Sequence, residues 1–130
     1  MSTTASRLGE ISLVALPSND VDKQIGFYES LGFEKRTDVP FGGQYRWVEV
    51  YPPSGATGIA LAPPPPGGEA GGKDTGIILT TDDIEATHAQ MKSNGVDVDA
   101  EVSRMGDPVP PMFWFRDTEG NTLLAVQQSQ

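Results

Sequence analysis

The side chains best suited to hold a small molecule begin with an indole and a carboxylate spaced two residues apart. Around them, Val48 and Val50 suit the buried face of a β-strand. Because side chains alternate along a strand, Tyr45, Trp47 and Glu49 are predicted on the other face. A carboxylate near apolar walls can act as a general acid or base, or orient a ligand by hydrogen bonds. A surface salt bridge is the alternative role for Glu49.

The second tryptophan of the chain has a similar setting. Phe113 and Phe115 suit the core, which leaves Met112 and Trp114 on the opposite face of their strand. The chain has only two tryptophans. Two indoles lining one apolar cavity would stack on a flat or aromatic molecule, whereas two indoles that fill a core would bind nothing.

Composition excludes several other kinds of site. The chain has no cysteine and one histidine, His88, so thiolate metal sites, disulfides, cysteine nucleophiles and sites with two histidine ligands from one chain are absent. His88 aligns on the helix face that packs on the sheet, and a structural role is predicted. The formal net charge of −9 makes nucleic acid a poor partner and favours a cationic or neutral ligand.

The polar N-terminus MSTTASRLGE lacks the apolar stretch of a signal peptide, and no apolar run approaches the ~20 residues that span a bilayer. We therefore expect a soluble, cytoplasmic protein with no membrane partner.

The elements that must position these residues occur twice. Residues 10–62 and 76–128 each read as a strand, a helix closed by glycine and three strands, and residues 63–75 are a Pro/Gly linker. The helical segments beginning at Asp20 and Asp83 align without gaps at an offset of 63. The expected strands are 11–16, 33–38, 44–51, 57–62, 76–81, 96–102, 111–116 and 122–127.

Neither βαβββ module is large enough to be stable alone. The prediction is one α+β domain over residues 1–130, in which the modules pair into a curved, eight-stranded mixed sheet with both helices on its outer face. A ligand would bind on the concave side, which we call the cup.

Two motifs support a family resemblance. The first helix, from Asp20-Val21-Asp22-Lys23 through Phe27-Tyr28 to Leu31-Gly32-Phe33, resembles the helix signature of the vicinal oxygen chelate superfamily (glyoxalase, bleomycin resistance protein, dioxygenase). Phe115-Arg116-Asp117-Thr118-Glu119-Gly120-Asn121 resembles that family's hairpin F-x-D-P-D-G-N, with Thr118 replacing Pro. The resemblance covers residues 10–128 and is specific for the fold, while the functions of its members differ widely.

In catalytic members of that superfamily, the first and last strands of each module carry ligands to a divalent metal. Carried onto this chain, the four positions hold Leu13, Gly76, Leu124 and either Ile59 or Ala60. None of these side chains can donate to a metal. The resemblance therefore implies a cup with no metal and no cofactor, and it disfavours glyoxalase, dioxygenase and thiol-transferase activities.

Two loop residues could close the rim of the cup, because glycine-bearing loops are mobile enough to act as lids: Phe41 and Met105. They could also be simple anchors of their loops. The residues predicted to contact a ligand are thus Trp47, Trp114, Tyr45, Glu49, Met112, Leu13, Leu124, Gly76, Phe41 and Met105.

Three functions remain open. The first is metal-independent binding of a largely aromatic natural product. Similarity to the metal-free resistance proteins implies a homodimer that sequesters a bleomycin-, mitomycin- or enediyne-type drug for antibiotic self-resistance. The second is a metal-independent isomerase, cyclase or lyase, with Glu49 as general base and Tyr45 assisting. The third is binding of a protein partner through the PPPPGG linker.

Overall fold

The computed structural model describes residues 7–40, 42–43 and 45–129. Each half of the chain folds as a βαβββ module, as the sequence pattern predicts. The first module contains β1 (Leu13–Pro17), α1 (Val21–Ser30), β2 (Glu34–Pro40), β3 (Arg46–Tyr51) and β4 (Gly58–Ala62). The second contains β5 (Asp74–Thr81), α2 (Ile84–Ser93), β6 (Asp97–Val98), β7 (Met112–Arg116) and β8 (Thr122–Gln127).

The predicted α+β class and the two modules are confirmed, with one difference in how the strands associate. The eight strands form two mixed four-stranded sheets, ordered β1-β4-β3-β2 and β5-β8-β7-β6. In each sheet the first strand pairs in parallel with the last, and the other pairs are antiparallel. Within the described residues, the edge strands β1 and β5 are not paired with each other, so one chain does not form a single eight-stranded sheet.

The helix boundaries follow from capping residues that the sequence shows. The Asp20 side chain accepts a hydrogen bond from the Lys23 amide at 3.1 Å, and Asp83 accepts from the Ala86 amide at 3.0 Å. Each cap satisfies a backbone donor that has no partner within the helix. Just beyond each helix, Gly32 and Gly95 have φ values of +98° and +82°, a conformation that glycine adopts without steric cost.

Most strands begin or end within two residues of their expected bounds, and the second module shows two differences of note. β5 begins at Asp74, so the last two residues of the expected linker belong to a strand. β6 covers only Asp97–Val98 of the expected 96–102. The chain leaves the sheet at Asp99, whose carbonyl accepts a hydrogen bond from His88 Nε2 at 2.7 Å. The ring of His88 also packs edge-on against Phe113, with ring centroids 4.9 Å apart, so His88 has the structural role that the sequence predicts.

The core lies between each sheet and its helix. Val48, Val50 and Leu61 of the first sheet are fully buried, as is Tyr28 of α1. In the second sheet the fully buried residues include Phe113 and Phe115. The strand alternation used in the sequence analysis therefore assigns the helix-facing positions of β3 and β7 correctly.

The two modules are joined by the turn between β7 and β8, residues 117–121, which we call the Asp117 turn. Asp117 is 6% exposed. Its Oδ2 accepts hydrogen bonds from Gln24 Nε2 (2.8 Å) and Tyr28 Oη (3.0 Å) of α1, and from Asn121 Nδ2 (2.9 Å). Its Oδ1 accepts from the backbone amides of Glu119 and Asn121, both at 3.0 Å. A carboxylate of the second module therefore satisfies two buried polar side chains of the first.

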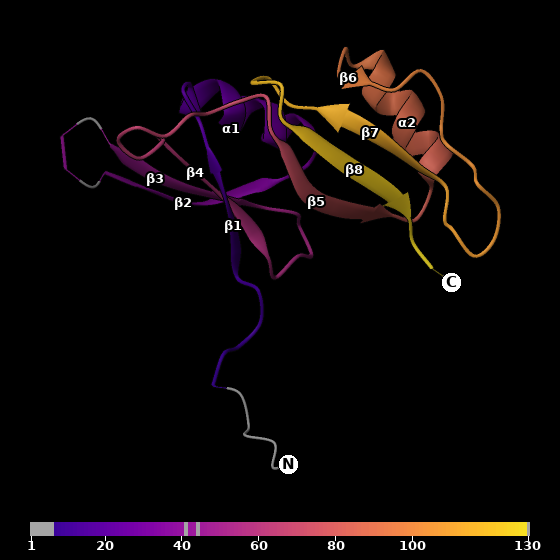
Figure 1. The fold of residues 1–130 in the computed structure, drawn as a ribbon, viewed down its shortest axis with the longest axis horizontal. Helices are drawn as coiled ribbons and strands as arrows, with labels where there is room; N and C mark the ends of the chain where they lie inside the picture. The colour runs from indigo at the N-terminus through magenta and orange to yellow at the C-terminus, as the bar shows by residue number, and fades with distance from the viewer. Residues whose placement is uncertain (1–6, 41, 44, 130) are drawn as a thin grey trace.

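Burial and the adjacent Asp117 carboxylate raise the pKa of Tyr28 well above its usual range, which keeps the phenol protonated as a donor. Next to this contact, Thr118 Oγ1 donates to Gln24 Oε1 at 2.7 Å, and Glu119 accepts from the Ser18 hydroxyl and the Asn19 amide. In Figure 1, α1 lies over the first sheet, next to the turn between β7 and β8, while α2 lies beside β6 and β7 at the other end of the molecule.

In the part of the chain that the structure describes, no helix has the length and the apolar character needed to cross a bilayer.

Candidate functional site

The first sheet presents an aromatic and acidic surface on the side away from α1, which we call the Trp47 face. Glu49 on β3 lies opposite Ala60 on β4, which in turn lies opposite Ala15 on β1. Trp47 and Tyr51 are on the same side of β3 as Glu49 by strand alternation. All three of these β3 side chains are half-buried. The predicted pairing of Trp47 and Glu49 on one face is therefore present in the structure.

The Glu49 carboxylate accepts a hydrogen bond from each of the two aromatic side chains next to it on this face. Trp47 Nε1 donates to Glu49 Oε2 at 2.8 Å, and Tyr51 Oη donates to Glu49 Oε1 at 2.9 Å. The hydrogen bond to Glu49 raises the pKa of Tyr51 above its usual value. Sequence reasoning did not select Tyr51, although one further step of the same two-residue alternation would have identified it.

Tyr51 is fixed by two further contacts. A Cβ atom at Gly58 would lie only 2.7 Å from the Tyr51 ring. The ring therefore packs against the backbone of Gly58, where any larger residue would clash with it. On β2, the guanidinium carbon of Arg36 lies 4.5 Å from the ring centroid, a cation–π contact. The same guanidinium donates to Glu34 and to backbone carbonyls of the turn after β3. These contacts hold the aromatic side chains of the Trp47 face in defined positions.

The second sheet presents a more apolar surface, the Trp114 face, again on the side away from its helix. Trp114 of β7 lies opposite Leu124 of β8, and Leu124 lies opposite Ile78 of β5. Together with Gly76 they line a pocket of about 110 Å³. Met112, also half-buried, occupies the equivalent side of β7 two residues before Trp114. The predicted grouping of Trp114, Met112, Leu124 and Gly76 is thus present, and Ile78, which is 59% exposed, joins it.

The register decides which residue of β4 occupies the position of a metal ligand in the first module. Ile59 lies opposite Val14 and Val50 and is buried in the core, whereas Ala60 lies opposite Glu49 on the Trp47 face. The positions that correspond to metal ligands are therefore Leu13, Gly76, Ala60 and Leu124. Their side chains offer no oxygen, nitrogen or sulfur, so they do not fit a divalent cation. Among the described residues, no three His, Cys, Asp or Glu side chains cluster closely enough to hold one.

Two predicted residues within the described part of the chain are not part of either face. Tyr45 precedes β3, where its amide donates to the Gly42 carbonyl, and it lines a separate groove at the start of α1. The two-residue alternation holds from Arg46, where the strand begins, and does not extend into this turn. Met105 is 67% exposed on the loop before β7 and lines neither pocket. Phe41 lies outside the described residues.

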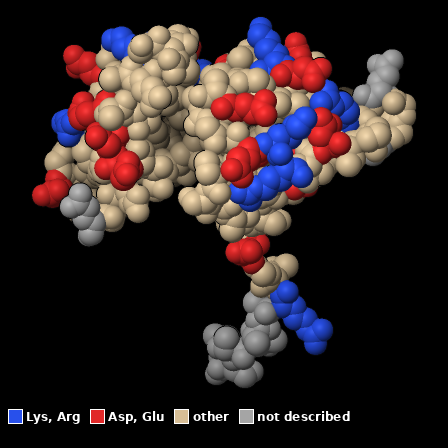
Figure 2. Space-filling view, turned by 180° about the vertical axis from the view of Figure 1, so that it is seen from behind, with Lys and Arg blue, Asp and Glu red and all other residues tan. Residues whose placement is uncertain are grey.

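The two tryptophans lie on equivalent strands of different sheets. The Trp114 pocket is lined only by residues of the second module, and the structure places no Trp47 atom in it. From behind, Figure 2 shows a furrow between the two lobes, with charged side chains toward the outer edge of one lobe and across the middle of the other. A cup that contains both indoles would therefore require the two faces to be brought together.

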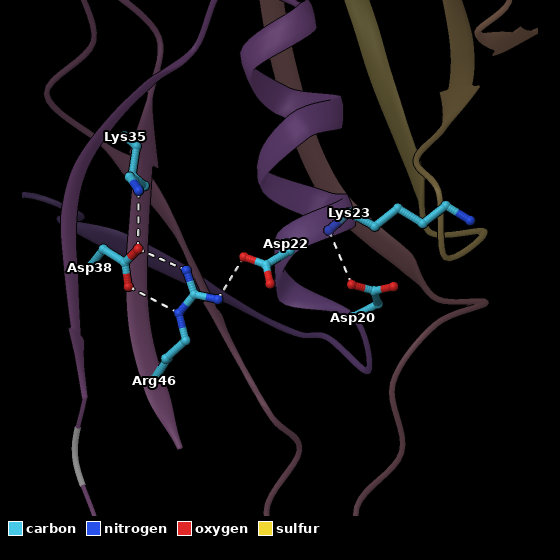
Figure 3. A network of polar contacts seen from close by, with 6 residues as sticks. All are labelled: Asp20, Asp22, Lys23, Lys35, Asp38 and Arg46. Carbon is cyan, nitrogen blue, oxygen red and sulfur yellow. Dashed lines mark hydrogen bonds and ion pairs between the residues drawn. The ribbon is translucent and has the colours of Figure 1, made fainter. Parts of the chain in front are cut away.

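The separate groove has a volume of about 540 Å³ and lies beside a network of charged residues. Arg46 bridges two carboxylates: Nε and Nη2 donate to Asp38 at 3.1 and 2.8 Å, and Nη1 donates to Asp22 at 2.7 Å. Lys35 donates to Asp38 from the other side, as Figure 3 shows. The network ties β2 and β3 to the first turn of α1. It engages each nitrogen of Arg46, so among the described residues that line the groove no cation is without a carboxylate partner.

A pH titration tests this network. The hydrogen bonds from Arg46 and Lys35 lower the pKa of Asp38 from its ordinary 3.8 to about 2. Because the folded-state pKa lies below the unfolded value, the network stabilises the protein fully above about pH 4 and loses its effect as pH falls through 2. Carboxyl-carbon NMR should give the low pKa for Asp38, and Arg46→Gln should raise it towards 3.8, whereas Lys23→Gln should not. An Asp38 that titrates near 4 in the wild type would contradict the network.

Comparison with known proteins gives a consistent result. Residues 10–124 match the model of the Glyoxalase/Bleomycin resistance protein/Dioxygenase superfamily. YetH of Bacillus subtilis, an uncharacterised protein, is 30% identical over 121 residues, which cover 88% of this chain and 95% of YetH.

Among solved structures, TnmS3, an antibiotic binding protein from Streptomyces sp. CB03234, superposes with a TM-score of 0.82 at 30% identity, covering 96% of this chain and 100% of TnmS3. A superfamily member from Sphaerobacter thermophilus superposes with a TM-score of 0.83 at 30% identity, covering 93% of this chain and 98% of that one.

Proposed function

Since the chain belongs to the Glyoxalase/Bleomycin resistance protein/Dioxygenase superfamily, we propose that it binds and sequesters a largely aromatic natural product, without a metal, as a means of antibiotic self-resistance. The observation that carries this proposal is the pair of sheet faces, each presenting one half-buried tryptophan on the same side as the positions that hold metal ligands in catalytic relatives. The similarity to TnmS3, an antibiotic binding protein, supports it. Bleomycin-, mitomycin- and enediyne-type compounds are the ligand classes we propose.

The chemistry of the two faces suits binding more than turnover. Trp47 and Trp114 offer flat apolar surfaces that gain free energy by stacking on an aromatic ligand and excluding water. Leu124 and Ile78 extend the apolar area on the second sheet. Sequestration needs only this affinity and enough protein, with no nucleophile or metal-bound water.

The proposed binding unit is a homodimer in which the Trp47 face of one chain meets the Trp114 face of its partner. Two observations support a second copy as the occupant of these faces. The edge strands β1 and β5 lie at open edges of the two sheets. Ile78 on β5 and Ile11 before β1 are 59% and 72% exposed, and large exposed apolar side chains at sheet edges favour association.

Light scattering on a sizing column tests the dimer. The wild type should elute with twice the chain mass of 13.9 kDa, and Ile78→Glu should weaken the dimer at least ~10-fold, since it buries an unpaired charge at the interface. Ala89→Glu, which adds the same charge on the exposed side of α2, should leave the mass unchanged. A wild type that elutes at a single chain mass at every concentration would exclude this arrangement.

Tryptophan fluorescence tests the function. Titration with bleomycin, mitomycin C and an enediyne should quench or shift the emission of the two indoles in a saturable manner. The bound compound should be recovered chemically intact after denaturation. Absence of any response to all three compounds would contradict the proposal.

One observation favours a second candidate function, which is enzymatic. The hydroxyl of Tyr51 lies 2.9 Å from the Glu49 carboxylate, an arrangement that could serve a metal-independent isomerase, cyclase or lyase with Glu49 as general base. That function requires the recovered compound to be altered and Glu49→Gln to stop the change. The same recovery experiment therefore separates binding from turnover.

A further inference from the structure

The Trp47 face and the Trp114 face differ in one respect that bears on the ligand. Glu49 places a carboxylate at the centre of the Trp47 face, whereas the pocket at Trp114 is walled by Gly76, Ile78 and Leu124. We propose that Glu49 binds a positively charged nitrogen of the ligand, so that the natural product is an aromatic compound carrying an amine or another cationic group. This inference rests on the proposed function.

Glu49 has no cationic partner among the described side chains. The ion pairs that the structure contains join other carboxylates, and the two groups hydrogen bonded to Glu49 are a neutral indole and a neutral phenol. A half-buried carboxylate without a counter-ion is stabilised by any cation that reaches it. A bound cation would therefore gain more at this position than at a carboxylate already paired.

The two arginines of the first sheet, Arg36 and Arg46, are held by other groups. Arg36 stacks on Tyr51 and donates to Glu34 and to the carbonyls of Pro52 and Pro53. Arg46 lies at the edge of the groove beside α1, held by Asp38 and Asp22. Neither can neutralise Glu49 without breaking these contacts.

Glu49 retains room to accept a further hydrogen bond. Each carboxylate oxygen has two acceptor positions, and each oxygen of Glu49 is used by one donor, Trp47 Nε1 or Tyr51 Oη. The Trp47 indole beside it adds a ring face, to which cations are attracted. A carboxylate flanked by two aromatic rings is thus matched to a protonated amine attached to a flat ring system, and the net charge of −9 attracts such a ligand at longer range.

The test compares two flat probes of one shape, 9-aminoacridine, which is a cation at neutral pH, and acridone, which is neutral. The wild type should bind 9-aminoacridine at least ~10-fold more tightly than acridone, as expected for a charge-assisted contact. Glu49→Gln should remove most of this preference by weakening 9-aminoacridine alone. Glu29→Gln, which removes the same charge from the exposed side of α1, should preserve it.

Each outcome has a distinct meaning. If Glu49→Gln weakens both probes equally, or neither, Glu49 does not recognise a cation and the inference is wrong while the proposed function stands. If the wild type binds both probes equally, the inference is likewise wrong. If neither probe nor any of the three drugs binds the wild type, the proposed function fails, and the inference fails with it. High salt should weaken the binding of 9-aminoacridine more than that of acridone.

Discussion

Replacing Asp117 by alanine is expected to lower the free energy of unfolding by about 3–5 kcal/mol, a severe loss for a single substitution. The carboxylate accepts five hydrogen bonds while almost fully buried. Without it, the Gln24 amide and the Tyr28 hydroxyl of α1 become buried donors with no acceptor. Urea unfolding followed by circular dichroism and by tryptophan fluorescence measures the effect.

Two control variants test whether the loss of stability in Asp117→Ala comes from its buried hydrogen bonds. Asp82→Ala removes an exposed carboxylate and should change stability by less than about 0.5 kcal/mol. Tyr28→Phe removes only one donor to Asp117 and should cost about 1 kcal/mol in an otherwise intact module. If Asp117→Ala were as stable as Asp82→Ala, the two modules would not depend on this contact.

Replacing Trp114 by alanine is expected to weaken ligand binding at least ~30-fold, the effect of removing a central aromatic anchor from a binding site. Trp114 lines the pocket of the second sheet from β7, opposite Leu124, and its half-buried indole supplies the largest flat surface there. Trp47→Ala is expected to have a similar effect on the other face. Calorimetric titration with whichever drug binds the wild type measures both, since it does not depend on tryptophan emission.

Phenylalanine variants distinguish stacking from collapse of the sheet. Trp114→Phe keeps an aromatic ring and should retain most of the affinity, whereas Trp114→Ala should lose it with little change in unfolding midpoint. Binding that survives in both Trp114→Ala and Trp47→Ala would place the ligand elsewhere, the groove beside α1 being the next site to test.

Sequence reasoning predicted the modules because repeat spacing and helix capping are local properties. The caps at Asp20 and Asp83 and the glycines after both helices can be read directly from the chain. Alternation likewise placed Trp47 with Glu49, and Trp114 with Leu124. The hydrogen bonds from Trp47 and Tyr51 to Glu49 depend on side-chain rotamers, which residue spacing does not reveal. Tyr51 was missed because the alternation was not continued two residues beyond Glu49.

The association of the sheets could not be read from the sequence. The turn at Asp117 was identified as a family motif, but its partners Gln24 and Tyr28 lie 93 and 89 residues away. No periodic pattern links residues at that distance. The expectation of one continuous sheet assumed that repeated modules meet at their edges, whereas in this chain they meet through α1.

The dependence of α1 on Asp117 also affects how the protein is made. During synthesis, residues 10–62 leave the ribosome long before Asp117 does, so Gln24 and Tyr28 are completed without the carboxylate that satisfies them. The first half of the chain is therefore expected to remain incompletely folded on the ribosome. Nascent chains arrested before residue 117 should be cleaved readily by protease, whereas those extended past the Asn121 position should become resistant.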